Sequence, residues 1–144
     1  AFFGAGAARS LVWGLAGGAV AVLAGVAYLW ILPRTPWFPE EVSRSLRMAP
    51  GVDPALAVLA VVGAPIFEEW IFRGLVFGGL RRSFGPWRAA LASAAIFAIM
   101  HPPLAVVPVF AVGLCAAAAY QRGGVLLAPV LVHALYNGAM VAMG

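Results

Sequence analysis

The sequence predicts an all-α protein, a polytopic bundle of about five transmembrane helices in which residues 1–144 form a single integral membrane domain. Three observations predict this class. Of the 144 residues, 64% are hydrophobic and only 10% are charged, whereas a soluble domain carries about 25% charged residues. The apolar residues form long uninterrupted runs, and prolines or arginines separate one run from the next. All nine basic residues are arginines, and most of them lie in the short stretches between the apolar runs.

Five apolar runs predict the helices: Leu11–Leu32, Ala55–Leu80, Trp87–His101, Leu104–Tyr120 and Val125–Met143. The third run is short, because a full crossing needs about 20 residues. We expect Pro108 to kink the fourth helix and Gln121–Gly124 to form a tight loop. The polar segment between the first two runs contains Glu40–Met48, which fits a short interfacial helix or a solvated loop equally well.

Composition also bounds the partners of the chain. The formal net charge is +4, but basic patches with interleaved aromatic residues are absent from the sequence, so we expect no nucleic acid partner. Arginines beside apolar runs are typical of the cytoplasmic ends of membrane helices. We therefore expect the lipid bilayer as the surroundings. The composition, rich in alanine and glycine and with arginine as its only basic residue, suggests a bacterial source, so the expected location is the cytoplasmic membrane of a bacterium. The single cysteine, Cys115, excludes an intrachain disulfide and is expected to pack in a helix.

Three charged residues interrupt the second apolar run: Glu68, Glu69 and Arg73. One charge at the centre of a membrane helix costs about 2.5–3.5 kcal/mol, so simple addition gives a cost on the order of 8–10 kcal/mol for three. Intramembrane charges therefore indicate a functional site.

The polar residues of three predicted helices lie at a similar depth. At the helical rise per residue, Glu69 lies about 20 Å from Arg82 and His101 about 20 Å from Arg88. On the last helix, His133 and Asn137 lie about 16 and 22 Å from Arg122. Antiparallel helices would thus bring these polar side chains together.

Spacing within the helices suggests separate roles. Glu69 and Arg73 stand four residues apart, in the favourable order for a helical ion pair, which leaves Glu68 as the freer carboxylate. A carboxylate and an imidazole, here Glu68 and His101, can take a proton from water. A second imidazole and a carboxamide, His133 and Asn137, can stabilise an oxyanion. This set of side chains favours hydrolysis without a covalent nucleophile.

The same residues resemble a known family. Residues 68–73 fit E-E-x-x-x-R, residues 97–101 fit F-x-x-x-H, and residues 133–137 fit H-x-x-x-N. In this order they are similar to the signature of the CAAX protease and bacteriocin-processing family, which are intramembrane glutamic endopeptidases. The resemblance covers a motif-bearing core of about residues 53–144. Family members often have more spans before the first motif, so this chain is expected to be a minimal or truncated version.

The resemblance implies a catalytic site with one role for each of six residues. Glu68 would be the general base, His101 would help to activate water, and Glu69 with Arg73 would position the site. His133 and Asn137 would form the oxyanion hole. No cofactor or metal is expected, and the substrate would be a membrane-associated protein or peptide.

Two alternatives come from other classes of protein. One is a zinc-dependent membrane metalloprotease that uses Glu68, His101 and His133 as metal ligands. The other is a non-catalytic membrane scaffold or immunity protein with the same fold.

Overall fold

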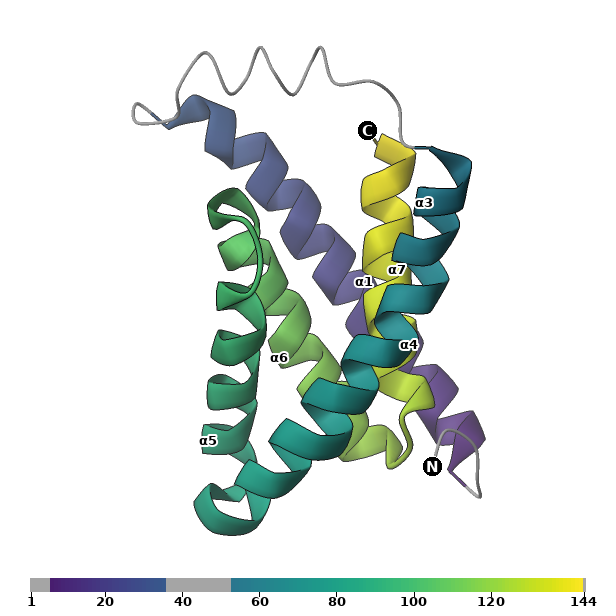
Figure 1. The fold of residues 1–144 in the computed structure, drawn as a ribbon, viewed down its shortest axis with the longest axis vertical. Helices are drawn as coiled ribbons and strands as arrows, with labels where there is room; N and C mark the ends of the chain where they lie inside the picture. Colours follow the sequence, from purple (N-terminus) through teal and green to yellow (C-terminus); the bar gives the residue numbers. More distant parts are fainter. Residues whose placement is uncertain (1–5, 36–52, 144) are drawn as a thin grey trace.

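The computed structural model describes residues 6–35 and 53–143, and every secondary-structure element within these ranges is helical (Figure 1). The segment Glu40–Met48, for which an interfacial helix or a loop was expected, lies outside the described residues. The predicted all-α fold is therefore confirmed for the described part of the chain.

The first helix, α1 (Ala7–Ile31), crosses the bundle diagonally and packs against α6 (Val106–Gly123) and α7 (Leu127–Met143) (Figure 1). It is followed by the short 3₁₀ helix η1 (Leu32–Arg34). The buried residues of α1 all have small side chains and follow helical spacing: Ser10, Gly14, Gly18, Ala21 and Gly25. Small residues allow the axes of membrane helices to approach closely.

The second predicted helix is one continuous helical run that contains two π-helical segments. It passes through α3 (Pro54–Val58), the π-helical segment η2 (Leu59–Gly63), α4 (Ala64–Glu69) and the π-helical segment η3 (Trp70–Phe77). The side chain of Asp53 caps its start by accepting hydrogen bonds from the N–H groups of Ala55 and Leu56. The two π-helical segments therefore directly flank α4, which carries both glutamates, and π-helical turns often occur at functional sites.

Helix α5 (Gly78–Ile99) contains a sharp reversal. Gly85 has φ 76° and ψ 170°, and Pro86 follows it. A positive φ favours glycine, and proline cannot continue the preceding hydrogen-bond ladder. The chain turns back at this point, at the lower left of Figure 1, so the second and third predicted helices are confirmed as two antiparallel arms.

The 3₁₀ helix η4 (Pro103–Ala105) leads into α6, and two local expectations are wrong here. Pro108 is the third residue of α6, where a backbone N–H has no helical partner anyway, so no kink results. Residues 121–123 continue α6 instead of forming a loop. The helix ends at Gly124, whose φ of 88° is left-handed.

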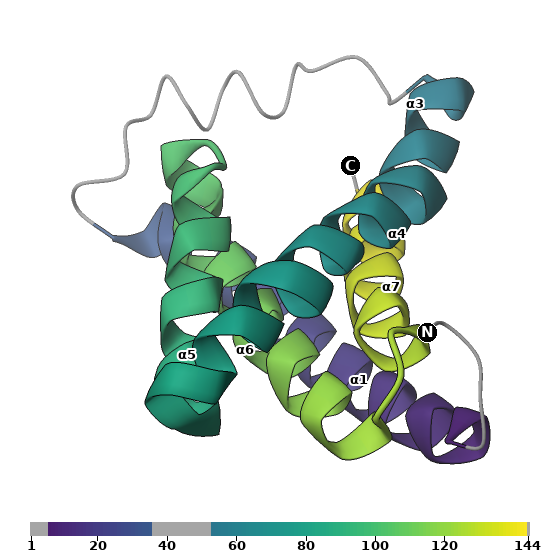
Figure 2. The ribbon, with the colours of Figure 1, turned by 60° about the horizontal axis from the view of Figure 1, so that its bottom comes forward.

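Within residues 6–35 and 53–143, three helical stretches are long and apolar enough to cross a membrane: Ala7–Arg34, Pro54–Ile99 and Pro103–Gly123. Helix α7 is a shorter apolar helix. Many large apolar side chains on these helices are exposed, among them Leu23, Phe67 and Ile99. Lipid chains would cover such surfaces in a bilayer. The length, composition and exposed apolar surfaces of these helices are those of an integral membrane protein. Figure 2 shows that α4 and α7 lie side by side, with α6 between α5 and α7.

Candidate active site

Four of the six sequence-predicted site residues line one cavity of about 280 Å³: Glu68, His101, His133 and Asn137. Glu68 comes from α4, His101 follows α5, and the other two come from α7. Apolar side chains form the rest of its wall: Ala60, Phe97, Val109, Val112, Tyr136, Met140 and Val141. The structure thus brings the three sequence motifs together around a largely apolar cavity.

Glu69 and Arg73 form a buried ion pair beside this cavity. Oε2 of Glu69 lies 3.0 Å from Nε of Arg73, and both side chains are fully buried. This pairing is the one that their spacing predicted. Nη2 of Arg73 also donates a hydrogen bond of 2.9 Å to the carbonyl of Gly113 on α6. The two residues therefore fasten the glutamate-bearing helix to α6.

Gly113 is needed for this contact and was missed by the sequence analysis. A Cβ atom at this position would lie 2.9 Å from Cβ of Ala94 and 3.3 Å from Nη2 of Arg73. Only glycine lets the α6 backbone come this close to both neighbours. A glycine in the middle of an apolar helix was the only signal in the sequence.

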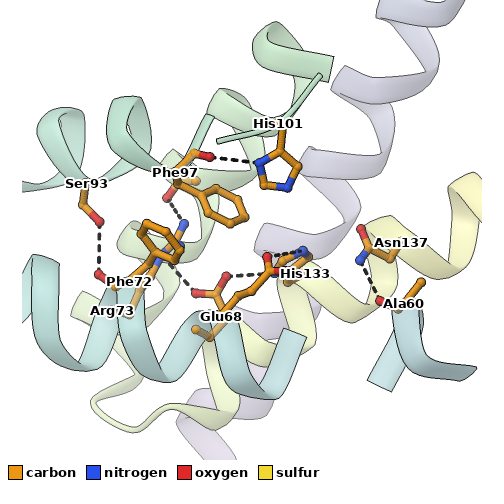
Figure 3. A network of polar contacts seen from close by, with 11 residues as sticks. Ala60, Glu68, Phe72, Arg73, Ser93, Phe97, His101, His133 and Asn137 are labelled. Carbon is orange, nitrogen blue, oxygen red and sulfur yellow. Dashed lines mark hydrogen bonds and ion pairs between the residues drawn. The ribbon is translucent and has the colours of Figure 1, made fainter. Parts of the chain in front are cut away.

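His133 lies between the two glutamates (Figure 3). Its Nδ1 is 3.0 Å from Oε1 of Glu69, and its Nε2 is 3.9 Å from Oε2 of Glu68. A carboxylate can only accept a hydrogen bond, so Nδ1 of His133 carries the donated proton. The opposite nitrogen, Nε2, therefore faces Glu68.

Glu68 differs from its neighbour in having no buried cation of its own. Its side chain is 30% exposed, and its Oε2 has no hydrogen-bond partner among the described residues. A buried carboxylate oxygen without a partner is uncommon, and such atoms call for an explanation by function or by bound water. Glu68 is thus the carboxylate that is free to bind a water molecule or a substrate in the cavity.

His101 lies just after the second arm of α5 and reaches the same cavity (Figure 3). Its backbone N–H donates to the carbonyl of Ala98 at 3.0 Å, and its Nδ1 lies 2.9 Å from the carbonyl of Phe97. The carbonyl must accept, so Nδ1 is the donor. In a neutral ring, Nε2 then keeps its lone pair and can accept a proton.

Phe97 packs in the core, where the residue is 1% exposed. The ring also contacts the site. Its centroid lies 4.8 Å from that of His101 and 5.5 Å from that of His133, in edge-to-face geometry. The guanidinium of Arg73 lies 4.9 Å from the same centroid. Phe97 therefore fixes the orientation of both imidazoles.

Asn137 is held by the π-helical segment η2. Its Nδ2 donates a hydrogen bond of 2.7 Å to the carbonyl of Ala60. In a π-helix an N–H bonds to the carbonyl five residues earlier, as Ala64 does here with Leu59. The N–H that would bond to Ala60 belongs to Pro65, which has none. The proline thus leaves one carbonyl free, and Asn137 occupies it.

Within residues 6–35 and 53–143, no group of three His, Cys, Asp or Glu side chains is placed to hold a metal ion. The zinc alternative requires Glu68, His101 and His133 to come together as ligands. These residues share a cavity but do not form a ligand set of that kind.

The fold and the cavity define a polytopic membrane protein with a carboxylate and imidazole site inside its helical bundle. The sequence model described as type II CAAX prenyl endopeptidase Rce1-like matches residues 50–139. The chain belongs to this Rce1-like family of CAAX prenyl endopeptidases.

Two curated bacterial proteins are similar to the chain. The protein named "Putative membrane peptidase YdiL" of Bacillus subtilis (strain 168) is 30% identical over 141 residues, which cover 93% of this chain and 56% of that protein. The membrane-embedded CAAX protease MroQ of Staphylococcus aureus (strain USA300) is 32% identical over 90 residues, covering 58% of this chain and 36% of MroQ. The chain thus spans about half the length of YdiL and about a third of MroQ. No solved structure shows a significant match.

Proposed function

We propose that this protein is an intramembrane endopeptidase of the glutamic type, which hydrolyses a peptide bond of a membrane-associated protein or peptide. One observation carries the proposal. Glu68 presents an unpartnered carboxylate oxygen to a cavity that His101 also lines, while the adjacent Glu69 is bound to Arg73 and His133. Two carboxylates in one helix turn therefore have separate tasks. Membership of the family and the names of its relatives support the coarser activity, that of a membrane protease.

In the proposed reaction, Glu68 and Nε2 of His101 hold a water molecule between them. Glu68 accepts a proton from this water as its oxygen attacks the carbonyl carbon of the scissile bond. The proton then passes to the leaving nitrogen, and the C–N bond breaks. The second proton of the water passes from the new carboxylic acid to the new amine. The products are a carboxylate and an ammonium group, so atoms and charge balance without a covalent intermediate.

His133 and Asn137 stabilise the negative charge that develops on the carbonyl oxygen. Asn137 uses one amide N–H for Ala60 and has a second one to offer. His133 donates through Nδ1 to Glu69, so it can also donate from Nε2 only when the ring carries both protons. The two donors are therefore not equivalent in this proposal.

The proposal is tested by comparing membranes that contain the wild-type protein with membranes that contain Glu68→Gln. Peptides released from membrane proteins are identified by mass spectrometry at matched expression levels. We expect one or more peptides to be released only by the wild type, and these would also identify the substrate. Equal peptide profiles in a cell where the wild type is functional would support the scaffold or immunity alternative.

The zinc alternative is tested separately. The purified protein is treated with a strong chelator, dialysed, and assayed on a substrate found in the first experiment. Retained proteolysis would support metal-independent hydrolysis. Loss of activity that zinc alone restores would support the metalloprotease alternative.

A further inference from the structure

A second pocket lies between α5 and α6, on a different part of the bundle from the candidate active site. Its volume is about 530 Å³, and most of its wall is apolar, with Trp87 and Leu91 on α5 and Leu114 and Ala118 on α6. It shares no lining residue with the cavity that contains Glu68. Trp87 is 76% exposed at the pocket, as is typical of tryptophans at the interface between lipid and water.

One end of this pocket is cationic. Gln121 and Arg122 line it there, and Nη1 of Arg81 donates a hydrogen bond of 2.8 Å to Oε1 of Gln121. The guanidinium of Arg122 lies 4.9 Å from the ring of Trp13. The residues Arg81, Gln121 and Arg122 are all exposed. The pocket thus joins an apolar wall to two guanidinium groups.

The surrounding surface has the same sign of charge. Arg82 and Arg88 flank the turn at Gly85, and Arg9 lies near Gly124 at the end of α6, so five exposed arginines gather at this end of the bundle (lower end of Figure 1). The acidic residues that the structure describes lie elsewhere: Asp53 starts α3 at the opposite end, and the two glutamates lie in α4. No described carboxylate therefore neutralises the arginines around the pocket.

We propose that this pocket binds an anionic phospholipid, with its phosphate at Arg81, Gln121 and Arg122 and one acyl chain along the apolar wall between α5 and α6. An arginine near the membrane surface attracts anionic lipid by about 1 kcal/mol, which corresponds to a factor of about five in affinity. A guanidinium also matches the oxygens of a phosphate in geometry. The acyl chain would lie along the apolar wall directly beside these guanidinium groups.

The test measures lipid binding to the purified full chain by native mass spectrometry. The protein is titrated with phosphatidylglycerol and, separately, with phosphatidylcholine carrying the same acyl chains. We expect preferential binding of phosphatidylglycerol. The double variant Arg81→Gln/Arg122→Gln should weaken that binding roughly ten- to thirtyfold. The control variant Arg34→Gln removes a charge at the opposite end of the bundle, beyond the end of α1, and should change it little.

A second measurement does not depend on any variant. Phosphatidylglycerol with a photoreactive group in its acyl chain is crosslinked to the wild type, and the modified peptides are mapped. Crosslinks in residues 86–91 and 114–122 would support the proposal. Crosslinks elsewhere, equal binding of both lipids, or equal weakening by the control variant would overturn it. Dimers of the chain in the native mass spectra, in place of lipid-bound monomers, would show that a second copy occupies the pocket and would also overturn the proposal.

Discussion

Nδ1 of His133 lies 3.0 Å from Oε1 of Glu69, so the last helix of the bundle is bound directly to the helix that carries both glutamates. Both side chains are almost completely buried. This contact places the other nitrogen of the ring 3.9 Å from Glu68. The carboxylate that does not face the cavity therefore orients an imidazole toward the one that does.

Replacing Glu68 by glutamine should abolish activity and leave the fold intact. The side chain is 30% exposed and has no buried cation that would lose its counter-ion. Loss of a general base lowers the rate by roughly 10²–10⁴-fold. Cleavage rate and the midpoint of thermal unfolding in detergent are the two measurements. Activity within a few-fold of the wild type would contradict the role proposed for Glu68.

The same substitution at Glu69 should mainly destabilise the fold. Glu69→Gln leaves the guanidinium of Arg73 buried without a counter-ion, and breaking a buried ion pair costs about 3–5 kcal/mol. We expect a clearly lower unfolding midpoint than for Glu68→Gln. The two variants differ from the wild type by the same chemical change at adjacent positions, so each controls for the other. Equal stabilities would show that the ion pair is not a structural anchor.

Replacing Pro65 by alanine should lower activity, although it adds a backbone N–H donor to the helix. The new N–H would compete with Asn137 for the carbonyl of Ala60. A misplacement of about 1 Å can cost up to roughly 100-fold in rate. The matched control is Pro108→Ala, because Pro108 lies in the first turn of α6 and leaves no carbonyl free. The kcat values of both variants are compared, and similar values would argue against a positioning role for Pro65.

A substitution in α1 should alter the candidate site by displacing side chains that line its cavity. A Cβ atom at Gly25 would lie 2.6 Å from Cε2 of Tyr136 and 3.3 Å from Cε of Met140, and both of these residues line the cavity. Gly25→Ala should therefore cost about 1–3 kcal/mol through overpacking and also reduce activity. Gly79→Ala, where a Cβ meets nothing within 4 Å, is the control. Unfolding midpoints and cleavage rates of both variants check this prediction, which a Gly25→Ala variant that matches the control in both would contradict.

Helix positions followed from the sequence because the apolar runs are long and their breaks are chemically distinct. The reversal at Gly85 and Pro86 separated two predicted helices at the right place. The ion pair of Glu69 and Arg73 followed from a spacing of four residues, since neighbours on one helix depend little on the rest of the fold.

Contacts between helices were harder to predict because many of them involve backbone carbonyls. The acceptors for Arg73 and Asn137 are the backbone carbonyls of Gly113 and Ala60. Every residue has such a carbonyl, so the residue type does not show which one accepts a hydrogen bond. Proline at residue 65 was an available signal, since it frees the carbonyl of Ala60 in a π-helical turn. The change from α to π winding could not be anticipated from apolar spacing alone.

The small residues along α1 have a consequence for how sequence variation is distributed in this helix. Each of the positions Gly14, Gly18 and Gly25 would bring a new Cβ within 3.0 Å of a side chain on α7. The other side of α1 bears large, exposed apolar residues such as Val12 and Leu23. A saturation mutagenesis profile should therefore show intolerance recurring every three or four residues, separated by positions that accept any apolar residue. Helix α1 contributes no polar group to the cavity, but it would determine how closely α7, the helix that bears His133, can approach.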